Sequence, residues 1–430
     1  MELLIKGGTV INPKTGVNEK LDILLKDNTI IAIEEDISPK NRKLIDARGM
    51  VVAPGFIDIH VHLREPGFEH KETIESGTES AVAGGFTTVA CMPNTKPTIH
   101  SKEIVEFIKE RVKKRGKANV LVIGSITKDL KGEELSDLDE MYEAGIVAIS
   151  DDGKTPMQEE IMIKAFKKAK EFNIPLISHC EDHDISKDGS INEGKASKRT
   201  NIKGIPSAAE YLIVKRDLEL CENTDSKLHI AHVSTKESVD LLRGAKSKGV
   251  NVTSEVAPHH FILTDDIITP ENTYTKVNPP IRSQEDVDSI VCGILDGTID
   301  IIATDHAPHD ENSKRVVYDK AAFGITGLET AFSLSYTYLV LKNKLPLIRL
   351  IEMLTIKPAE IIGVDRGSLE VGKEADITIL DLKEEYTIDS KEFYSKGKNT
   401  PFNGYRVMGK PVYTIVAGKI VYERGSGICL

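Results

Sequence analysis

The chain has 430 residues, of which 40% are hydrophobic and 29% charged, and it carries a formal net charge of −11. This length can hold one large domain with a small one beside it. The negative charge argues against nucleic acid as a partner, because phosphate binding needs a basic surface. The chain contains no apolar run long enough for a membrane span and no signal-peptide layout at its start, so we expect a cytoplasmic protein with no membrane partner.

Short strand patterns separated by turn residues occupy both ends of the chain. Near the start they predict strands at residues 3–6, 9–11, 21–25, 30–33 and 44–46. Near the end they predict strands at residues 367–369, 375–380, 385–388, 405–407, 412–417 and 419–422. Neither segment can bury much of a core alone. We therefore expect residues 1–52 and 366–430 to pair into one small composite β-sandwich domain.

Residues 53–365 alternate apolar runs with amphipathic helical stretches, which is typical of βα units around a parallel sheet. The runs predict eight strands, at residues 55–63, 87–92, 119–126, 146–150, 175–179, 227–233, 250–256 and 300–304. Helices are expected between and after them, among them residues 101–113, 158–171, 208–222, 237–248, 327–341 and 347–354. This α/β pattern favours a (β/α)₈ TIM barrel. A doubly wound open sheet would need a glycine-rich loop after its first strand, and none is there.

The first barrel strand carries two histidines close together. Residues 56–64 alternate apolar with polar side chains, so Asp58, His60, His62 and Arg64 are expected to share one face. Two imidazoles side by side make half of a metal site, since neutral imidazole suits zinc and its neighbours. Ordinary strand histidines are the alternative, and only further residues of the right kind can outweigh it.

Those further residues follow other predicted strands. Barrel enzymes build their sites at the carboxyl ends of the strands. Five of the eight predicted ends together carry four histidines and two aspartates that could bind metal: His60, His62, Asp152, His179, His232 and Asp305. These residues supply enough ligands for two divalent ions that share a carboxylate, a site that can activate water and polarise a carbonyl oxygen.

Several segments resemble the dihydroorotase family of the amidohydrolase superfamily. The first is residues 58–69 with Lys71-Glu72-Thr73. The similarity continues through Met92-Pro93-Asn94-Thr95, Ser150-Asp151-Asp152-Gly153, Asn278-Pro279-Pro280-Ile281-Arg282, residues 304–309 and residues 323–329. It is closest to the longer, class I branch. The resemblance implies reversible hydrolysis of L-dihydroorotate to N-carbamoyl-L-aspartate, run as cyclisation in pyrimidine biosynthesis.

The resemblance also implies a metal-ligand set. His60, His62 and Asp305 would hold one zinc ion, and His179 and His232 a second, with two ions per subunit expected rather than one. Many superfamily members bridge their ions with a carboxylated lysine, whereas class I dihydroorotases use an aspartate that Asp152 matches. Lys154 stays open as a carboxylated alternative, and Asp151 would be a helper or structural residue.

Substrate contacts follow from the same resemblance. Asp305 would act as general base and then general acid. Arg64, Asn94 and His309 would bind the substrate carboxylate, for which a bidentate guanidinium is well suited. Asn278 would contact the ring, together with backbone groups of Phe323 and Gly324. From the residues alone, the charged run 310–320, which shows no periodicity, is expected to be a mobile loop over the site, with a plain solvated loop as the alternative.

Two alternatives remain at this point. The first is a related cyclic amidase, such as an allantoinase, hydantoinase or dihydropyrimidinase, whose rings lack the carboxylate that Arg64 would bind. The second is a catalytically silent relative that serves as an assembly partner; such proteins lose metal ligands, and here none is missing. The expected partners are the small-molecule substrate, a second copy in a homodimer, and aspartate carbamoyltransferase.

Overall fold

A parallel barrel forms the larger part of the molecule. The computed structural model describes residues 2–40 and 42–429. Eight parallel strands lie in the order β15-β14-β13-β10-β9-β8-β7-β6. Their bounds are β6 Phe56–Val61, β7 Phe86–Cys91, β8 Asn119–Gly124, β9 Ile146–Ile149, β10 Leu176–Ser178, β13 Leu228–Ile230, β14 Val252–Val256 and β15 Ile301–Ile302. A parallel bridge between Val61 and His306 brings the last strand's extension beside the first. The predicted barrel is confirmed.

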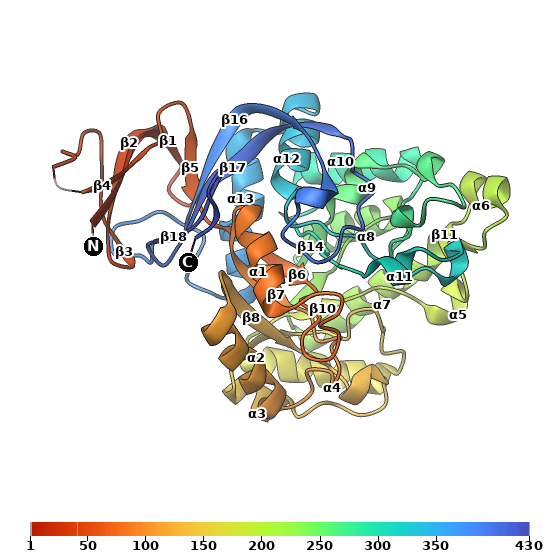
Figure 1. Cartoon of the computed structure of the whole chain (residues 1–430). Helices are drawn as coiled ribbons and strands as arrows, with labels where there is room; N and C mark the ends of the chain where they lie inside the picture. The colour runs from red at the N-terminus through yellow and green to blue at the C-terminus, as the bar shows by residue number, and fades with distance from the viewer. Residues whose placement is uncertain (1, 41, 430) are drawn as a thin grey trace.

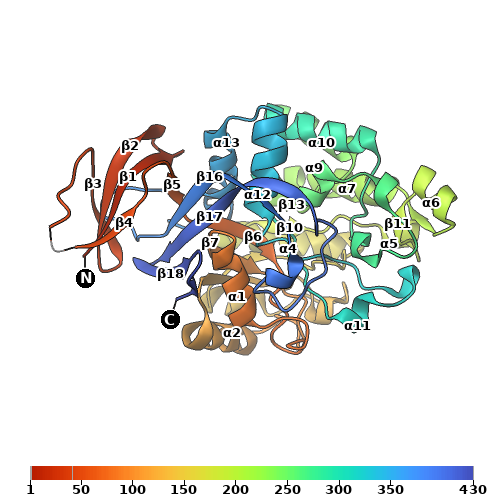
Figure 2. The same cartoon turned by 45° about the horizontal axis from the view of Figure 1, so that its top comes forward.

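Helices surround these strands (Figures 1 and 2). The longer ones are α1 Ile74–Ala83, α2 Lys102–Arg115, α4 Glu159–Phe172, α7 Ala208–Thr224, α8 Lys236–Ser247, α10 Gln284–Asp296 and α13 Leu347–Leu354. The shorter ones are α3 Leu138–Glu143, α5 His183–Ser186, α6 Lys195–Thr200, α9 Pro258–Ile262, α11 Glu311–Lys314, α12 Ala331–Ser335 and α14 Ile356–Ile362. Within residues 2–40 and 42–429, every helix is too short or too polar to cross a bilayer.

Local sequence explains where a helix such as α10 begins and ends. The Ser283 side chain accepts a hydrogen bond from the Asp286 backbone N–H, and the Asp286 carboxylate accepts one from the Ser283 N–H. This reciprocal cap satisfies N–H groups that have no partner inside the helix. The helix stops at Gly297, whose φ of 81° suits glycine and ends the helical hydrogen bonding.

Strands from both ends of the chain form one sheet beside the barrel, where both termini also lie (Figure 1). Its order is β19-β18-β17-β16-β5-β1-β2-β3, with β4 beside β1. The bounds are β1 Glu2–Asn12, β2 Val17–Lys26, β3 Thr29–Glu34, β4 Lys43–Asp46, β5 Val51–Pro54, β16 Ile377–Thr387, β17 Arg406–Val416, β18 Lys419–Glu423 and β19 Gly427–Ile428. The two ends join where Ile379 of β16 pairs with Val52 of β5. From this pairing we propose two domains: a small β domain built from residues 1–52 and 366–430, and the barrel domain of residues 53–365.

This sheet has a core of its own. Ile5, Ile23, Ile377 and Ile415 come from strands far apart in the sequence, and they pack in one buried cluster. Burial of such side chains contributes about 1.5–3 kcal/mol each relative to exposure. The two ends of the chain thus stabilise each other, which neither segment could achieve alone.

Candidate metal centre and adjoining cavity

The six predicted ligands converge at the carboxyl ends of the barrel strands. His60 and His62 lie at the end of β6, and the others follow β9, β10, β13 and β15 in turn. The Nε2 atom of His62 lies 3.1 Å from Asp305 Oδ1. All six side chains are at least nine-tenths buried, so the structure brings the whole predicted set together out of solvent.

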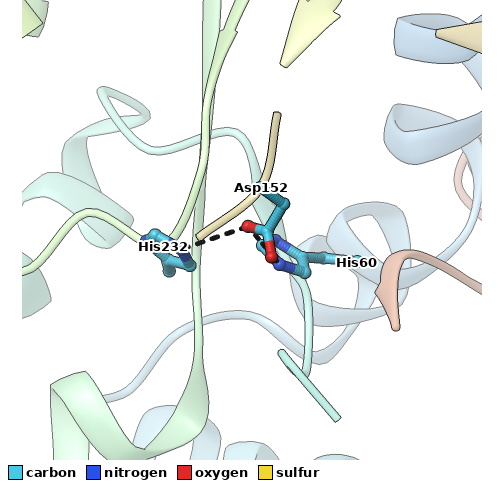
Figure 3. Close-up of side chains that lie close together, drawn as sticks. All are labelled: His60, Asp152 and His232. Atoms are coloured by element: carbon cyan, nitrogen blue, oxygen red, sulfur yellow. Dashed lines mark ion pairs between the residues drawn. The ribbon is translucent and has the colours of Figure 1, made fainter. Parts of the chain in front are cut away.

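Asp152 occupies the middle of this cluster. Its carboxylate oxygens lie between 3.3 and 3.9 Å from a ring nitrogen of each of the four histidines. Two overlapping groups could hold a metal ion, namely His60 with Asp152 and His232, and His60 with His62 and Asp305. Figure 3 shows the first of them. His60 belongs to both groups, so the two potential ion positions adjoin.

The donor atoms fit a divalent cation. His60 Nε2 and Asp152 Oδ1 are buried and face each other at 3.3 Å, yet neither has a hydrogen-bond partner within residues 2–40 and 42–429. Buried polar atoms are almost always bonded in folded proteins. Imidazole nitrogen and carboxylate oxygen are ordinary ligands of zinc and related ions. A cation between these atoms would satisfy both.

Electrostatics keep the carboxylates ionised. Burial opposes the charge of Asp152, but the nearby His60, together with His179 and His232, holds its pKa well below its usual range. Burial likewise opposes the charge of Asp305, but the hydrogen bond with His62 and the nearby histidines lower its pKa to about 2. Both residues are therefore anions at neutral pH, as metal ligation requires.

Two glutamates that the sequence reasoning missed stand behind the ligands. Glu255 Oε1 lies 2.5 Å from His60 Nδ1, and Glu181 Oε2 accepts from His179 Nε2 at 3.2 Å. Partners of this kind fix which ring nitrogen faces the metal. The sequence held a signal for both: Glu181 lies two residues after His179, and Glu255 is the one charged residue in β14.

Two further aspartates near the ligands, Asp58 and Asp151, occupy structural positions. Asp58 accepts hydrogen bonds from the backbone N–H groups of His60, at 3.0 Å, and Thr304, at 3.1 Å, and so joins the first strand to the last. Burial raises the pKa of Asp58 to about 7. Asp151 accepts from the Thr127 N–H at 3.0 Å, which leaves Asp152 as the aspartate of this pair that faces the histidines.

A cavity of about 190 Å³ opens beside the ligands. The predicted substrate residues that line it, along with most of the ligands, are Arg64, Asn94, Asn278, Phe323 and Gly324. Predicted residue His309 lies just behind this wall, where its Nε2 donates to the Phe323 carbonyl at 2.8 Å. Every predicted site residue thus lies in or next to one cavity.

Arg64 lines the cavity, but it does not lie on the strand from which its orientation was predicted. Strand β6 ends at Val61, and Arg64 has a left-handed φ of 63°. The Arg64 Nε donates to the Pro308 carbonyl at 3.2 Å. Among the described residues, no carboxylate forms an ion pair with Arg64, and the neighbouring Glu65 pairs with Arg111. Burial lowers the Arg64 pKa to about 10, so the side chain remains a cation free to bind an anion.

The two asparagines tie the cavity to the ligands. Asn94 accepts from His62 Nδ1 at 2.9 Å and donates to Asp152 Oδ2 at 3.1 Å. Asn278 donates to Glu181 Oε2 at 2.8 Å. Each amide therefore fixes a ligand or a ligand's partner while its side chain also borders the cavity.

The segment 310–320, predicted to be a mobile loop, contains α11 and a 3₁₀ turn at Tyr318–Lys320. The Lys314 ammonium is fully buried and donates to the carbonyls of Ala322 and Lys276, at 2.7 and 3.2 Å. The Lys276 ammonium donates to the Tyr318 carbonyl and lies 4.4 Å from the Phe323 ring centre. These two buried lysine side chains anchor the segment that carries the cavity wall.

Gly324 meets a strict steric requirement in that wall. Its φ is 120°, and a Cβ there would lie 2.6 Å from the Ala307 Cβ. Only glycine tolerates both conditions.

The family models and curated relatives agree on one family. Residues 49–238 match the model described as dihydro-orotase-like, and residues 296–422 match the amidohydrolase family model. The dihydroorotase of Acetivibrio thermocellus is 49% identical over 419 residues, which cover 97% of this chain and 98% of that protein. The dihydroorotase of Bacillus cytotoxicus is 46% identical over 428 residues and covers 100% of both chains.

Solved structures share the fold at lower identity. The L-hydantoinase (dihydropyrimidinase) from Arthrobacter aurescens superposes with a TM-score of 0.90 at 28% identity, covering 100% of this chain and 97% of that one. The D-hydantoinase (dihydropyrimidinase) from a Thermus species gives 0.86 at 25% identity, again covering 100% and 97%. Because almost half of the residues are identical to curated dihydroorotases from end to end, this chain belongs to the dihydroorotase family of the amidohydrolase superfamily.

Proposed function

We propose that this protein is a dihydroorotase, which hydrolyses the ring amide of L-dihydroorotate reversibly to N-carbamoyl-L-aspartate and runs as the cyclisation in pyrimidine biosynthesis. Family membership supports the reaction type. The observation that carries the substrate assignment is Arg64, a half-buried guanidinium without an ion-pair partner among the described residues, in the cavity that the metal ligands border. A ring substrate that bears a carboxylate would complete this pair.

Two zinc ions are the proposed cofactors. His60, His62 and Asp305 would hold one, His179 and His232 the other, with Asp152 shared. Asp152 is favoured over a carboxylated Lys154 because it lies within 3.9 Å of all four histidines, whereas Lys154 is exposed. Ions bound there supply a water activated at neutral pH and a Lewis acid for the amide oxygen.

Asp305 is the proposed proton carrier. It borders the cavity, and its pKa of about 2 keeps it ionised, the form that can accept a proton. Asp305 takes a proton from the attacking water as the oxygen–carbon bond forms. It then delivers that proton to the ring nitrogen as the carbon–nitrogen bond breaks. The cyclisation follows the same steps in reverse.

The opposite wall is the proposed substrate-binding surface. Arg64, Asn94 and His309 would hold the substrate carboxylate, and Asn278 with the backbone of Phe323 and Gly324 would contact the ring. Burial, with Arg64 nearby, lowers the pKa of His309, so this side chain stays neutral. The single N–H of neutral His309 donates to the Phe323 carbonyl, so it would have to turn from that carbonyl to the substrate. The carboxylate would then meet one guanidinium charge flanked by neutral polar groups.

The test is turnover of L-dihydroorotate against dihydrouracil by zinc-reconstituted protein. The two rings differ by the carboxylate that Arg64 would bind. We expect dihydroorotate to react and dihydrouracil to be ignored. If dihydrouracil is preferred, the protein is one of the related cyclic amidases. If neither substrate reacts while zinc is bound, the protein is a catalytically silent relative.

We also propose a cytoplasmic homodimer that can associate with aspartate carbamoyltransferase, on the family resemblance alone. Gel filtration of this protein, alone and mixed with that enzyme, tests both associations. A monomeric elution position would contradict the dimer, and an unshifted elution of the mixture at micromolar concentration would contradict the association.

A further inference from the structure

Glu255 forms hydrogen bonds with two of the proposed metal ligands, His60 and His232, and with a third histidine, His229. It is 1% exposed and lies on β14, which contributes none of the predicted ligands. Its Oε1 faces His60 Nδ1 at 2.5 Å and accepts from the His232 backbone N–H at 3.3 Å. One carboxylate oxygen thus contacts residues assigned to both ion positions.

The contact with His60 determines which nitrogen can bind metal. A carboxylate offers only acceptor sites, so the proton of neutral His60 must lie on Nδ1. Nε2 then presents a lone pair, and this is the buried atom without a hydrogen-bond partner that faces Asp152. Because His60 belongs to both candidate metal groups, its tautomer decides whether it can serve as a ligand in either one.

The contact with His232 holds a strained backbone. His232 has a φ of 28°, a conformation that residues other than glycine rarely adopt. The Glu255 side chain accepts the His232 N–H, and the Glu255 backbone carbonyl accepts the Val233 N–H at 2.9 Å. These two hydrogen bonds hold the backbone N–H groups of His232 and Val233, and so fix the position from which the His232 side chain projects.

The second Glu255 oxygen is also fixed. His229 Nε2 donates to Oε2 at 3.1 Å, and His229 Nδ1 pairs with the Thr253 hydroxyl at 2.8 Å. His229 is fully buried and pairs directly with Thr253 across β13 and β14. The carboxylate cannot rotate without breaking bonds on both oxygens.

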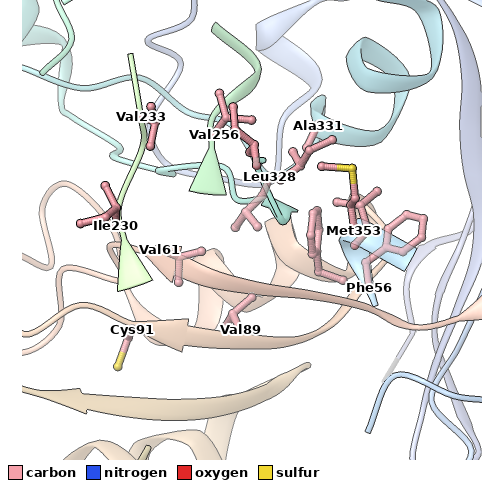
Figure 4. Packing of buried hydrophobic residues seen from close by; sticks show 14 of the residues in the cluster. Phe56, Val61, Val89, Cys91, Ile230, Val233, Val256, Leu328, Ala331 and Met353 are labelled. Carbon is pink, nitrogen blue, oxygen red and sulfur yellow. The ribbon is translucent and has the colours of Figure 1, made fainter. Parts of the chain in front are cut away.

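Apolar packing holds the three backbones that meet at Glu255. Val61, Val233 and Val256 follow His60, His232 and Glu255 in the sequence, and all three are fully buried in one cluster (Figure 4). Interiors packed in this way transmit small displacements instead of absorbing them. The hydrogen bonds of Glu255 therefore act between segments that are already rigid.

We infer that Glu255 is a positioning residue of the metal centre, which selects the metal-binding tautomer of His60 and fixes the distance between His60 and His232. The inference rests on the proposed metal binding and not on the substrate assignment. Glu255 touches neither the cavity nor the reacting atoms.

A graded pair of variants tests it. Glu255→Gln keeps one acceptor oxygen for His60, and His229 can adapt because the Thr253 hydroxyl either donates or accepts. Glu255→Met fills a similar volume without any acceptor. Loss of groups behind metal ligands typically costs about 10 to 100-fold in affinity, so we expect roughly 10-fold for Gln and roughly 100-fold for Met.

The readout is zinc retained at graded chelator concentrations, with the visible spectrum of cobalt-substituted protein and the unfolding midpoint of metal-free protein. Asp22→Asn is the matched control. Asp22 is a buried carboxylate in the small sheet that accepts from the Gly7 and Ile37 N–H groups, at 2.7 and 2.8 Å. We expect this control to lose stability but to keep zinc affinity and the cobalt spectrum.

Wild-type zinc affinity and an unchanged cobalt spectrum in Glu255→Met would overturn the inference. If that variant does not fold, unchanged affinity in Glu255→Gln overturns it equally. A wild-type protein that binds no zinc would remove the proposed metal centre and this inference together. A wild-type protein that binds zinc but ignores dihydroorotate would remove only the substrate proposal.

Discussion

The two ends of the cavity are built differently. At the metal end each ligand lies at or just beyond a barrel strand, and the most exposed of the six side chains, Asp305, is 8% exposed. At the substrate end the residues lie on connecting segments. Arg64, Asn94 and Asn278 are half-buried there, and Phe323 is 36% exposed.

This difference suggests that the strand ends carry the metal chemistry, whereas the connecting segments determine which substrate is bound. Strand ends in a closed barrel are rigid, so ligand positions can persist while connecting segments change. The hydantoinase from Arthrobacter aurescens fits this view, since its fold superposes closely although only 28% of its residues are identical. Substitutions at the metal end should therefore abolish metal binding, whereas substitutions at the substrate end should change KM with zinc still bound.

The largest effect is expected from Asp152→Asn. This change removes the negative charge that faces four histidines and leaves a neutral amide between the ion positions. We expect zinc affinity to fall by more than about 100-fold, because even groups behind ligands cost about 10 to 100-fold. Zinc content and dihydroorotate turnover would both be measured.

Lys154→Met is the control for Asp152→Asn, since Lys154 is exposed two residues further on. We expect this variant to retain zinc and activity. If Lys154→Met loses zinc while Asp152→Asn retains it, a carboxylated lysine bridges the ions and the assignment of Asp152 is wrong.

Arg64→Lys should give an intermediate effect confined to the substrate end. A lysine keeps the charge but loses the paired N–H groups that match a carboxylate. Hydrogen bonds to charged groups contribute about 1.5–3 kcal/mol, so KM for dihydroorotate should rise roughly 10- to 150-fold. Zinc content should not change. An unaltered KM would show that Arg64 does not bind the substrate carboxylate, and loss of zinc would show that the two ends are not independent.

The same contrast explains what the sequence could predict. The eight strands were predictable, and so was the convergence of the six proposed ligands, because strand periodicity places residues such as His179 and His232 at strand ends. Arg64 was correctly placed near the cavity, although its left-handed backbone lies beyond the strand. Glu255 was not identified, because only the fold brings β14 behind His60.

Two other differences have local physical causes. Residues 3–6 and 9–11 were predicted as two strands but belong to one, β1. A β-bulge joins the two parts: the pairing register shifts between Ile5 and Gly8, and Gly7 adopts a φ of 74°. Such a bulge absorbs an extra residue without ending the strand.

Lys314 lies in a charged run, so the sequence alone suggests that it is exposed. Its burial depends on carbonyl groups of Thr273 and Lys276, which are distant in the chain.

The smallest effect on activity is expected from Lys314→Met, which loosens the cavity wall without touching substrate. KM should rise less than in Arg64→Lys, with zinc unchanged. Burial lowers the pKa of Lys314 from 10.5 to about 7, so between these pH values the folded protein leaves it neutral while the unfolded chain binds a proton. Wild-type stability should therefore rise with pH across this window relative to the variant, by up to about 1.4 kcal/mol per pH unit. Urea unfolding of both proteins across the window measures this, with exposed Lys320→Met as the control. A constant difference in stability would mean that Lys314 stays protonated, held by its three carbonyl acceptors.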